Sequence, residues 1–257
     1  APVQNIGAYG AEVAELIASV RAWDRLRNRV VWLALGELGL AYRDSRLKQS
    51  LTDAEVGGGR LWGPTGRWVV LDATFAVRQG SLSSRVAYSQ LAGALGVELG
   101  ERVPERELRE AVLKLRRSKG MVLDGVDHDT WSAGSFFTNP ILTEDQAGNL
   151  PEDAPRFPVT DHSQVVLGTK EAPVIEGLVK TSAAWLIDHA GFTKGFTVEP
   201  GAPAGLSTKH VLALTNRGGA TGADLARLRD EVVAGVRERY GVTLTPEPVQ
   251  VGFQDLS

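Results

Sequence analysis

The stretch TGADLARLRDEVVAGVRERYG, residues 221–241, is the clearest helix in the sequence and sets how the surrounding chain must pack. Thr221 can cap its first turn, and Asp224 stands at the position of a capping box. The apolar residues that recur on one face are Leu225, Leu228, Val232, Val236 and Tyr240. A helix with one apolar face needs a core beneath it, so we predict a packed helix over this stretch.

Shorter elements surround this helix. HVLALTN (210–216) predicts a short buried strand, and PEPVQVGF (246–253) predicts a second strand. Upstream, SAAWLIDHAG (182–191) predicts a helix with a serine cap. Residues 143–178 contain several prolines and little periodicity, so we predict a long irregular connection there.

The N-terminal half also mixes strands with helices. EVAELIASVRAWD (12–24) fits a helix in its first half and a strand in its second. PERELREAVLKLRR (104–117) predicts a helix, with acidic residues in its first turn and arginines in its last. WVVLDATFAV (68–77) alternates like a half-buried strand. Its predicted buried face carries Val69, Leu71, Ala73, Phe75 and Val77. Because strands and helices mix without a regular βαβ repeat, we predict the α+β class.

Composition narrows the function classes. The chain has 257 residues, 43% of them hydrophobic and 23% charged, which is typical of a soluble globular protein with one large or two modest domains. A net charge of −3 gives no reason to expect binding to nucleic acid or to an anionic membrane. The absence of cysteine excludes disulfides, thiolate metal sites and a cysteine nucleophile.

No single motif in the sequence is specific enough to indicate a function. The four histidines, which neither pair nor cluster, argue against a metal site: His128, His162, His189 and His210. Ser135 follows a glycine but lacks the Gly-x-Ser-x-Gly elbow of a hydrolase, and RGGATG (217–222) lacks a phosphate-loop lysine. AYRDSRLK (41–48) and Glu247, held between two prolines, each fit a solvated turn as well as a site.

In combination and in order, these motifs resemble one family. The matching segments are PVQNIGAYG (2–10), YRDSRLK (42–48), GSFFTNP (134–140), LSTKHVLALTNRGGAT (206–221) and GVTLTPEPV (241–249). They resemble the UDP-N-acetylenolpyruvoylglucosamine reductase (MurB) family along nearly the whole chain, with insertions near 49–66 and 144–180. GSFFTNP and YRDS are the most specific of them.

The resemblance implies a flavoprotein oxidoreductase of peptidoglycan synthesis, and hence a role in cell wall biogenesis, cell shape and cell division. Such an enzyme uses NADPH and FAD to reduce UDP-N-acetylglucosamine enolpyruvate to UDP-N-acetylmuramate. It implies a monomer in the cytoplasm, with neither nucleic acid nor membrane as partner. The implied fold is part of an FAD-binding, vanillyl-alcohol-oxidase-like domain plus a C-terminal α+β substrate-binding domain.

The resemblance also implies three catalytic residues. Hydride reaches C3 of the enolpyruvyl group, and the enolate-like species left at C2 takes a proton. Arg43 resembles the arginine that offsets charge on the substrate, and Glu247 resembles its glutamate partner. Ser135 resembles the proton donor to C2, a weak acid that needs hydrogen-bonded surroundings.

Binding residues follow from the same likeness. The residues that resemble substrate contacts are Tyr88, Lys119, Asn139 and Lys194, of which the two lysines suit a diphosphate. The residues that match a flavin-side loop are Gln4, Asn5, Gly7, Tyr9 and Gly10. No metal is implied.

The predicted domains are 1–124, the remainder of the FAD-binding domain; 125–241, the substrate-binding domain; and 242–257, a segment returning to the first. Family members carry a glycine-rich flavin lobe upstream of PVQNIGAYG. We therefore expect this chain alone to bind FAD poorly and to turn over little.

Two other classes stay open. The first is a redox-inactive module that binds a nucleotide sugar, although such a binder needs none of Arg43, Ser135 and Glu247. The second is a carbohydrate hydrolase that uses Glu247 with an aspartate, although no spacing in the sequence supports such a pair of carboxylates. Reduction of a bound flavin by NADPH would distinguish the reductase from both, because neither a binding module nor a hydrolase carries out that reaction.

Overall fold

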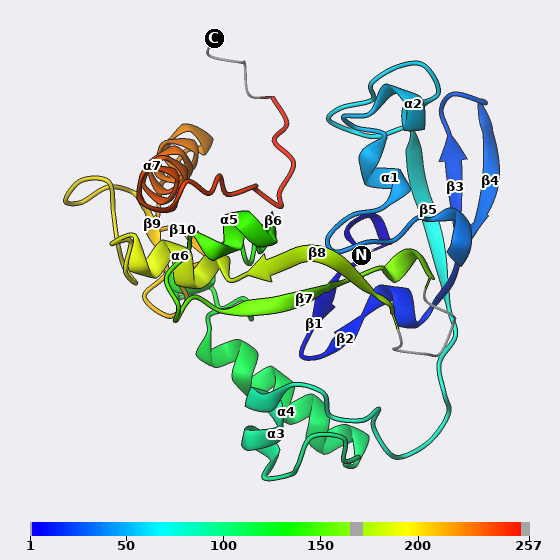
Figure 1. The fold of residues 1–257 in the computed structure, drawn as a ribbon, viewed down its shortest axis with the longest axis horizontal. Coiled ribbons are helices and arrows are strands. Elements are labelled where there is room, and N and C mark those ends of the chain that lie inside the picture. Colours follow the sequence, from blue (N-terminus) through cyan, green and yellow to red (C-terminus); the bar gives the residue numbers. More distant parts are fainter. Residues whose placement is uncertain (1, 165–171, 253–257) are drawn as a thin grey trace. The chain divides into compact units, whose positions relative to one another are not determined.

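A computed structural model describes residues 2–164 and 172–252 of the chain (Figure 1). The chain divides into two compact units. Unit 1 comprises residues 1–108, 160–175 and 249–257, and unit 2 comprises residues 109–159 and 176–248. Helices and strands occur in both units, which confirms the α+β class. The functional domains expected at 1–124, 125–241 and 242–257 stay a prediction.

Unit 1 is built on a three-stranded antiparallel sheet in the order β4-β3-β5. Its strands are β3 (Ile17–Asp24), β4 (Arg29–Ala34) and β5 (Trp68–Phe75). The ambiguous segment 12–24 is thus mostly strand. The other short elements of unit 1 are η1 (Pro2–Gln4), β1 (Gly7–Ala8), β2 (Ala11–Glu12), η2 (Val13–Glu15), η3 (Leu35–Glu37), α1 (Arg46–Gln49), α2 (Ala54–Gly57), α3 (Ser89–Leu95) and η5 (His162–Gln164).

The predicted buried face of β5 is wrong. Val69, Leu71 and Phe75 are 45–48% exposed, while Trp68 is buried at 6%. The register between β3 and β5 shifts near Arg21, where the ladder contains an irregularity. A slip of one residue exchanges the two faces of a strand, so strict alternation does not run through β5.

Unit 2 contains a second sheet, in the order β6-β8-β7. The elements of this region are β6 (Ile141–Thr143), α5 (Glu144–Gly148), β7 (Arg156–Thr160) and β8 (Val174–Thr181). The irregular connection predicted over residues 143–178 is therefore wrong. Pro158 lies within β7, which is an edge strand, and an edge strand tolerates a residue without an amide donor.

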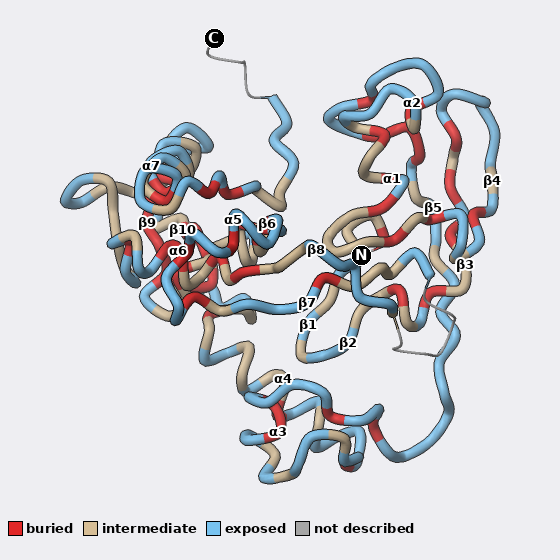
Figure 2. Tube along the Cα trace, viewed as in Figure 1, coloured by how far each residue is buried: buried red, intermediate tan, exposed pale blue. Residues whose placement is uncertain are grey.

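The core of unit 2 lies beneath the predicted long helix. The remaining elements are α4 (Glu105–Ser118), η4 (His128–Thr130), α6 (Ala183–His189), β9 (Ala204–Leu206), β10 (Leu214–Asn216) and α7 (Gly222–Tyr240). Leu228, Val232 and Val236 of α7 are fully buried, and Figure 2 shows these buried turns beside β9 and α6. Thr221 caps α7 in a capping box with Asp224, as predicted.

The two strands predicted beside α7 are shorter than expected. β10 occupies only the last three residues of the segment 210–216. Within 246–252, the described part of the other segment, the structure assigns no strand, although Pro246 forms an isolated bridge to Phe137. Pro246 and Pro248 lack amide donors, so a ladder cannot extend along this segment. Phe253 lies outside the described residues.

Gly235 lets α7 approach the core closely. A Cβ built on Gly235 would overlap the ring of Phe192, which is itself only 8% exposed. We expect Gly235→Ala to lower the free energy of unfolding by about 1–3 kcal/mol, because overpacking outweighs the better helix propensity of alanine. Urea unfolding measures the effect.

Gly93 in α3 is the matched control, since a Cβ there meets nothing within 4 Å. Gly93→Ala should raise stability by about 0.5–1 kcal/mol. A Gly235→Ala protein that is stabilised to the same extent would show that α7 and Phe192 are not in close contact.

Candidate active site

Two of the predicted catalytic segments pair with each other in unit 2. The amide of Glu247 donates to the carbonyl of Phe136 at 2.8 Å, and the amide of Thr138 donates to the carbonyl of Thr245 at 3.1 Å. Phe137 and Pro246 form the bridge between these bonds. Ser135 and Glu247, both half-buried, are thus brought into neighbouring positions on paired segments.

The two phenylalanines of GSFFTNP have different tasks. Phe137 is 2% exposed and belongs to the core of unit 2, which anchors the segment. Phe136 is half-buried and its amide donates to the carbonyl of Leu212 at 2.7 Å, which ties the segment to the β9–β10 connection. Gly134 adopts φ +84°, a conformation that favours glycine, and so turns the chain just before Ser135.

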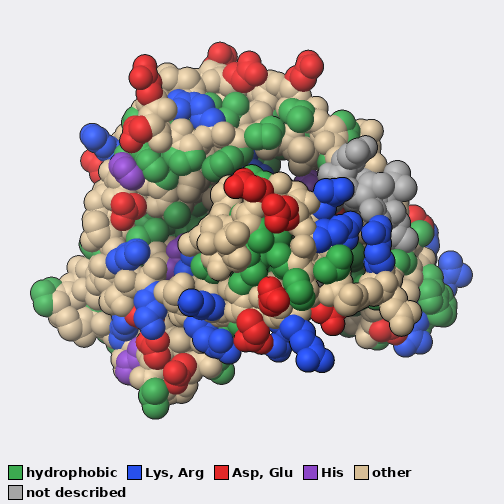
Figure 3. Space-filling model, turned by 90° about the horizontal axis from the view of Figure 1, so that it is seen from below, with side chains coloured by type: hydrophobic (Ala, Val, Ile, Leu, Met, Phe, Trp, Pro, Cys, Tyr) green, Lys and Arg blue, Asp and Glu red, His purple; other side chains and the backbone are tan. Residues whose placement is uncertain are grey.

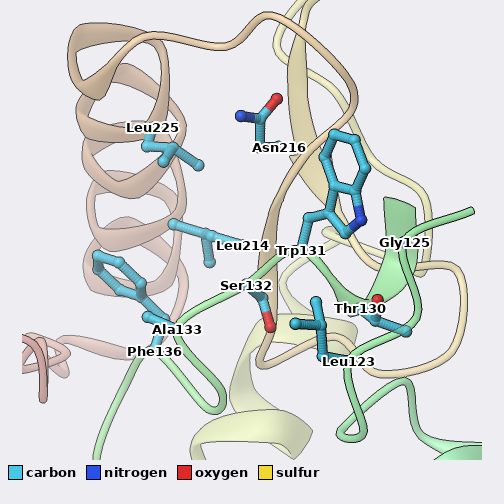
Figure 4. Close-up of a pocket in the computed structure, with 10 residues that line it drawn as sticks. All are labelled: Leu123, Gly125, Thr130, Trp131, Ser132, Ala133, Phe136, Leu214, Asn216 and Leu225. Atoms are coloured by element: carbon cyan, nitrogen blue, oxygen red, sulfur yellow. The ribbon is translucent and has the colours of Figure 1, made fainter. Parts of the chain in front are cut away.

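A cavity of about 670 Å³ adjoins this segment (Figure 4). Its lining residues are Leu123, Gly125, Thr130, Trp131, Ser132, Ala133, Phe136, Leu214, Asn216 and Leu225. Figure 4 shows the Trp131 indole on one side and Leu225 on the other, with the Asn216 amide between them. A cavity of this volume, mostly apolar with a few polar groups, has the character of a small-molecule site.

Asn139 takes part in the fold. Its Oδ1 accepts a hydrogen bond from the amide of Ala183 at 3.0 Å, at the start of α6. That bond satisfies one of the amides left without a partner at a helix N-terminus. The substrate contact expected of Asn139 stays a prediction, and this oxygen is already engaged.

Arg43 is held by the predicted flavin-side loop in unit 1. Its guanidinium donates to the carbonyls of Gly7 at 2.6 Å and Asn5 at 3.2 Å. The ammonium of Lys48 in turn donates to the Arg43 carbonyl at 3.0 Å. Arg43 itself has φ +52°, a strained conformation of the kind that clusters at functional sites.

The flavin-side loop is built around Asn5, whose side chain is fully buried. Its Oδ1 accepts from the amide of Ala14, and its Nδ2 donates to Glu12 and to the carbonyl of Ala41, each at 3.0 Å. Because these bonds use both the oxygen and the nitrogen of the side-chain amide, Asn5 links the loop to Glu12, Ala14 and Ala41 and holds its conformation. Tyr9 lies further along the loop with φ +54°.

The structure brings Tyr88 to the same loop. The rings of Tyr9 and Tyr88 meet edge to face with their centroids 5.6 Å apart. A Cβ on Gly10, which has φ +80°, would lie 3.0 Å from the Cβ of Ala87. A predicted substrate residue and the predicted cofactor loop therefore meet within unit 1.

The residues of this loop fit one wall of a flavin site. Arg43 and Asn5 hold the backbone in a fixed turn, and Tyr9 presents a half-buried ring beside Tyr88. A rigid turn with an aromatic ring can support a planar cofactor, with Gln4 and Gly7 in the same loop. The loop carries no glycine-rich diphosphate cradle.

One residue that the sequence did not single out joins the predicted lysines in unit 2. Burial, together with the positive charges of Lys119 and Lys194, lowers the pKa of His210 from 6.5 to about 4. Burial also lowers the pKa of Lys119. His210 is thus neutral at pH 7. Spacing could not reveal it, because the three residues are far apart in the sequence.

Acidic residues beside this cluster are already paired. Burial opposes ionisation of Asp129, yet hydrogen bonds from Thr208 and the charge of Arg217 hold its pKa below the ordinary value. Arg217 lies 3.0 Å from the Asp129 carboxylate. Asp127 pairs with Lys209, and hydrogen bonding within that pair lowers the pKa of Asp127.

The pKa of His210 predicts a pH dependence of stability. Between pH 6.5 and 4 the unfolded chain binds more protons at this residue than the folded one, so stability falls as the pH falls. The loss amounts to about 3 kcal/mol once both values are passed. Urea unfolding at pH 7 and at pH 4.5 should show a smaller loss for His210→Gln than for the natural chain, and equal losses would contradict the assignment.

Other classes of site find no support in the described structure. Within residues 2–164 and 172–252, no three His, Asp or Glu side chains gather as they would around a metal ion. No helix there combines the length and the apolar character needed to span a bilayer. The face drawn in Figure 3 carries acidic and basic side chains close to one another. Their fields partly cancel, so an anion would be attracted only where a few basic side chains stand together.

Comparison with known proteins gives one family. Residues 126–251 match the family model described as UDP-N-acetylenolpyruvoylglucosamine reductase, C-terminal domain. Proteins named UDP-N-acetylenolpyruvoylglucosamine reductase match at 49% identity, one from Cutibacterium acnes over 98% of this chain and 58% of its own length, another from Streptomyces coelicolor over 98% and 60%. The chain spans about three fifths of these relatives.

A solved structure described as UDP-N-acetylenolpyruvylglucosamine reductase (MurB) from Thermus caldophilus is 21% identical, with a TM-score of 0.46. It covers 96% of this chain and 57% of that one, a likeness too weak to place residues. The family model, over residues 126–251, and these relatives, over 98% of the chain, agree. The chain belongs to the UDP-N-acetylenolpyruvoylglucosamine reductase family.

Proposed function

We propose that this chain is the part of a UDP-N-acetylenolpyruvoylglucosamine reductase that holds the nucleotide sugar and protonates the reduced enolpyruvyl group. The observation that carries the proposal is the pairing of residues 136–138 with 245–247. Ser135 and Glu247, which the family likeness assigns to one reaction, belong to these paired segments, and Phe136 of the first segment lines a cavity of about 670 Å³.

In the proposed reaction, a flavin held in part by the loop of Gln4, Asn5 and Gly7 would supply hydride derived from NADPH. The double bond of the enolpyruvyl ether accepts this hydride at C3, and electron density moves toward C2 and the carboxylate. Ser135 delivers a proton to C2, which completes the lactyl ether. A serine hydroxyl is a weak acid, so the transfer depends on neighbouring groups that share the charge.

Glu247 and Arg43 support this transfer in different ways. Glu247 stands between Pro246 and Pro248, whose rings restrict the backbone on both sides of it, and its amide is tied to the Phe136 carbonyl. We propose that it stabilises the enol form next to Ser135. Arg43 supplies the positive charge that offsets the substrate carboxylate, and its bonds to the loop carbonyls fix its direction.

The other predicted site residues bind the substrate or the flavin. In unit 2, Lys119 and Lys194 hold the diphosphate as point charges. Tyr88, which packs against Tyr9 in unit 1, is proposed as a further substrate contact. The loop that contains Gln4, Asn5 and Gly7 supports the flavin.

The test uses this chain and a version extended to the full length of its relatives. The extended protein should bind FAD, oxidise NADPH and form UDP-N-acetylmuramate from the enolpyruvyl substrate. The chain alone should bind the nucleotide sugar with little turnover. An extended protein that binds the nucleotide sugar but shows no flavin reduction by NADPH would favour the redox-inactive binding module instead.

A further inference from the structure

The segment that follows β7 returns the chain to unit 1. Residues 160–175 belong to that unit, although β7 begins in unit 2 and β8 ends there. His162 opens η5 in this segment, and its side chain is only 16% exposed. It lies in the insertion near 144–180, outside the segments that carry the family likeness, so the likeness assigns it no role.

The imidazole of His162 lies between a hydroxyl and a carboxylate. Its Nε2 is 2.9 Å from Oγ1 of Thr160, and its Nδ1 is 3.3 Å from Oε2 of Glu12. A carboxylate only accepts hydrogen bonds, so the Nδ1 that faces it carries the proton. This Nδ1 is buried and makes no hydrogen bond of good geometry among the described residues. Because a buried N–H without an acceptor is costly, the Glu12 carboxylate is held close to it.

Glu12 is joined to the flavin-side loop in two ways. The same Oε2 accepts a hydrogen bond from Nδ2 of Asn5 at 3.0 Å. A Cβ on Gly7, which pairs with Glu12 across β1 and β2, would lie 2.6 Å from Cγ of Glu12. The stem of the Glu12 side chain therefore packs directly on the Gly7 backbone. The position of this one side chain bears on Asn5 and Gly7 together.

Asn5 and Gly7 are also the residues that hold Arg43. Their carbonyls accept from two different nitrogens of its guanidinium, at 3.2 and 2.6 Å. Such bonds direct a guanidinium because its donors lie in one rigid plane. The contacts thus run from His162 through Glu12 and the loop to Arg43, and all of them lie within unit 1.

We infer that His162 is a positioning residue, which holds Glu12 and through it fixes the flavin-side loop and the direction of Arg43. The inference rests on the proposed function for the part that Arg43 plays in the reaction. His162 itself contacts no reacting atom. It restricts the orientations of the Arg43 guanidinium before the substrate carboxylate arrives, and a charge that is already in place stabilises the transition state best.

Amide hydrogen exchange of the 257-residue chain tests the link to the loop without any flavin. The reporter is the amide of Ala14, which donates to Oδ1 of Asn5 at 3.0 Å. In His162→Leu this amide should exchange at least about tenfold faster, because local opening of the loop becomes easier. The control is the amide of Arg25, which donates to the carbonyl of Arg67 in the same unit and should keep its rate.

Unchanged exchange at Ala14 in His162→Leu would overturn the inference. Equal acceleration at Ala14 and Arg25 would overturn it too, because the substitution would then only destabilise unit 1. If the variant does not fold, the ¹⁵N resonances of the imidazole in the natural chain decide instead. They should show a proton on Nδ1 of His162, and an unprotonated Nδ1 would contradict the contact with Glu12.

Two conservative variants separate the two sides of the ring. The side-chain amide of His162→Asn offers a donor near the position of Nδ1, whereas that of His162→Gln offers one near the position of Nε2. His162→Asn should therefore restore slow exchange at Ala14, and His162→Gln should not. The opposite order would assign the role of His162 to its contact with Thr160 and would overturn the inference.

The chain extended to the full length of its relatives tests the link to Arg43. With FAD saturating, His162→Leu should slow the return of flavin colour on adding the enolpyruvyl substrate about tenfold, and bleaching by NADPH should change by less than about twofold. His189→Leu, at the exposed end of α6, should change neither rate. Unaltered transfer to the substrate in His162→Leu would overturn the inference. An extended natural protein whose flavin NADPH does not reduce would contradict the proposed function, while exchange at Ala14 would still decide whether His162 fixes the loop.

Discussion

A Ser135→Ala variant of the chain extended to the full length of its relatives is expected to keep reduction by NADPH and lose transfer to the substrate. Stopped-flow absorbance should show normal bleaching of the flavin by NADPH. On adding the enolpyruvyl substrate, the colour should return about 10²- to 10⁴-fold more slowly than in the natural protein. The reason is that Ser135 provides the proton that completes reduction, whereas the NADPH step does not involve it.

The matched control is Ser118→Ala, which removes an exposed hydroxyl that only donates to the Leu115 carbonyl on α4. Both half-reactions should be unchanged in that protein. Normal return of the flavin colour in Ser135→Ala would rule out this serine as the proton donor. Equal slowing of both half-reactions would mean that the substitution disturbs the fold around the pairing with Glu247.

Arg67→Met should lower the free energy of unfolding of unit 1 by about 3–5 kcal/mol, because it removes the buried partner of a buried carboxylate and leaves only the exposed Arg27 as a cation near it, at 3.8 Å. The side chains of Asp24 and Arg67 are 1% and 7% exposed, and Arg67 donates to both carboxylate oxygens, at 2.7 and 3.0 Å. Burial opposes ionisation of Asp24, but the bonds from Arg67 and nearby amides hold its pKa below 3.8. Urea unfolding, followed by circular dichroism, measures the loss.

Arg21→Met supplies the comparison within the same sheet. Arg21 and Asp72 also join β3 to β5, yet their side chains are 44% and 48% exposed. An exposed pair contributes at most about 1 kcal/mol, so this variant should be nearly as stable as the natural chain. Since the pKa of Asp24 is lowered in the natural chain, the buried pair stays ionised there from pH 5 to 8. Similar losses in the two variants would contradict the buried pair.

Elements that depend on neighbouring residues could be predicted from the sequence. The capping residues and the apolar positions of α7 all lie within residues 221–240, so the start of this helix at Thr221 can be predicted from that segment alone. The same holds for α6, which Ser182 caps through a bond from the amide of Trp185. Amphipathic spacing and caps are local signals, and here tertiary packing agrees with them.

Features set by distant partners could not be predicted in this way. The outer face of β5 depends on an irregularity in its pairing with β3, and β7 can be a strand despite Pro158 because it lies at a sheet edge. The pKa of His210 is lowered by burial and by the charges of Lys119 and Lys194, which belong to distant parts of the sequence. The family likeness named Ser135 and Glu247, but only the fold shows that their segments pair.

The pairing of residues 136–138 with 245–247 also sets the order in which the protein can mature during synthesis. Thr138 and Thr245 are 107 positions apart, so the ribosome must make the whole intervening chain before the two segments meet. Until then Ser135 has no neighbouring glutamate, and the core around Phe137 lacks one of its walls. Contacts of such long range slow folding, and a nascent chain that waits for them exposes apolar surface through which it can aggregate.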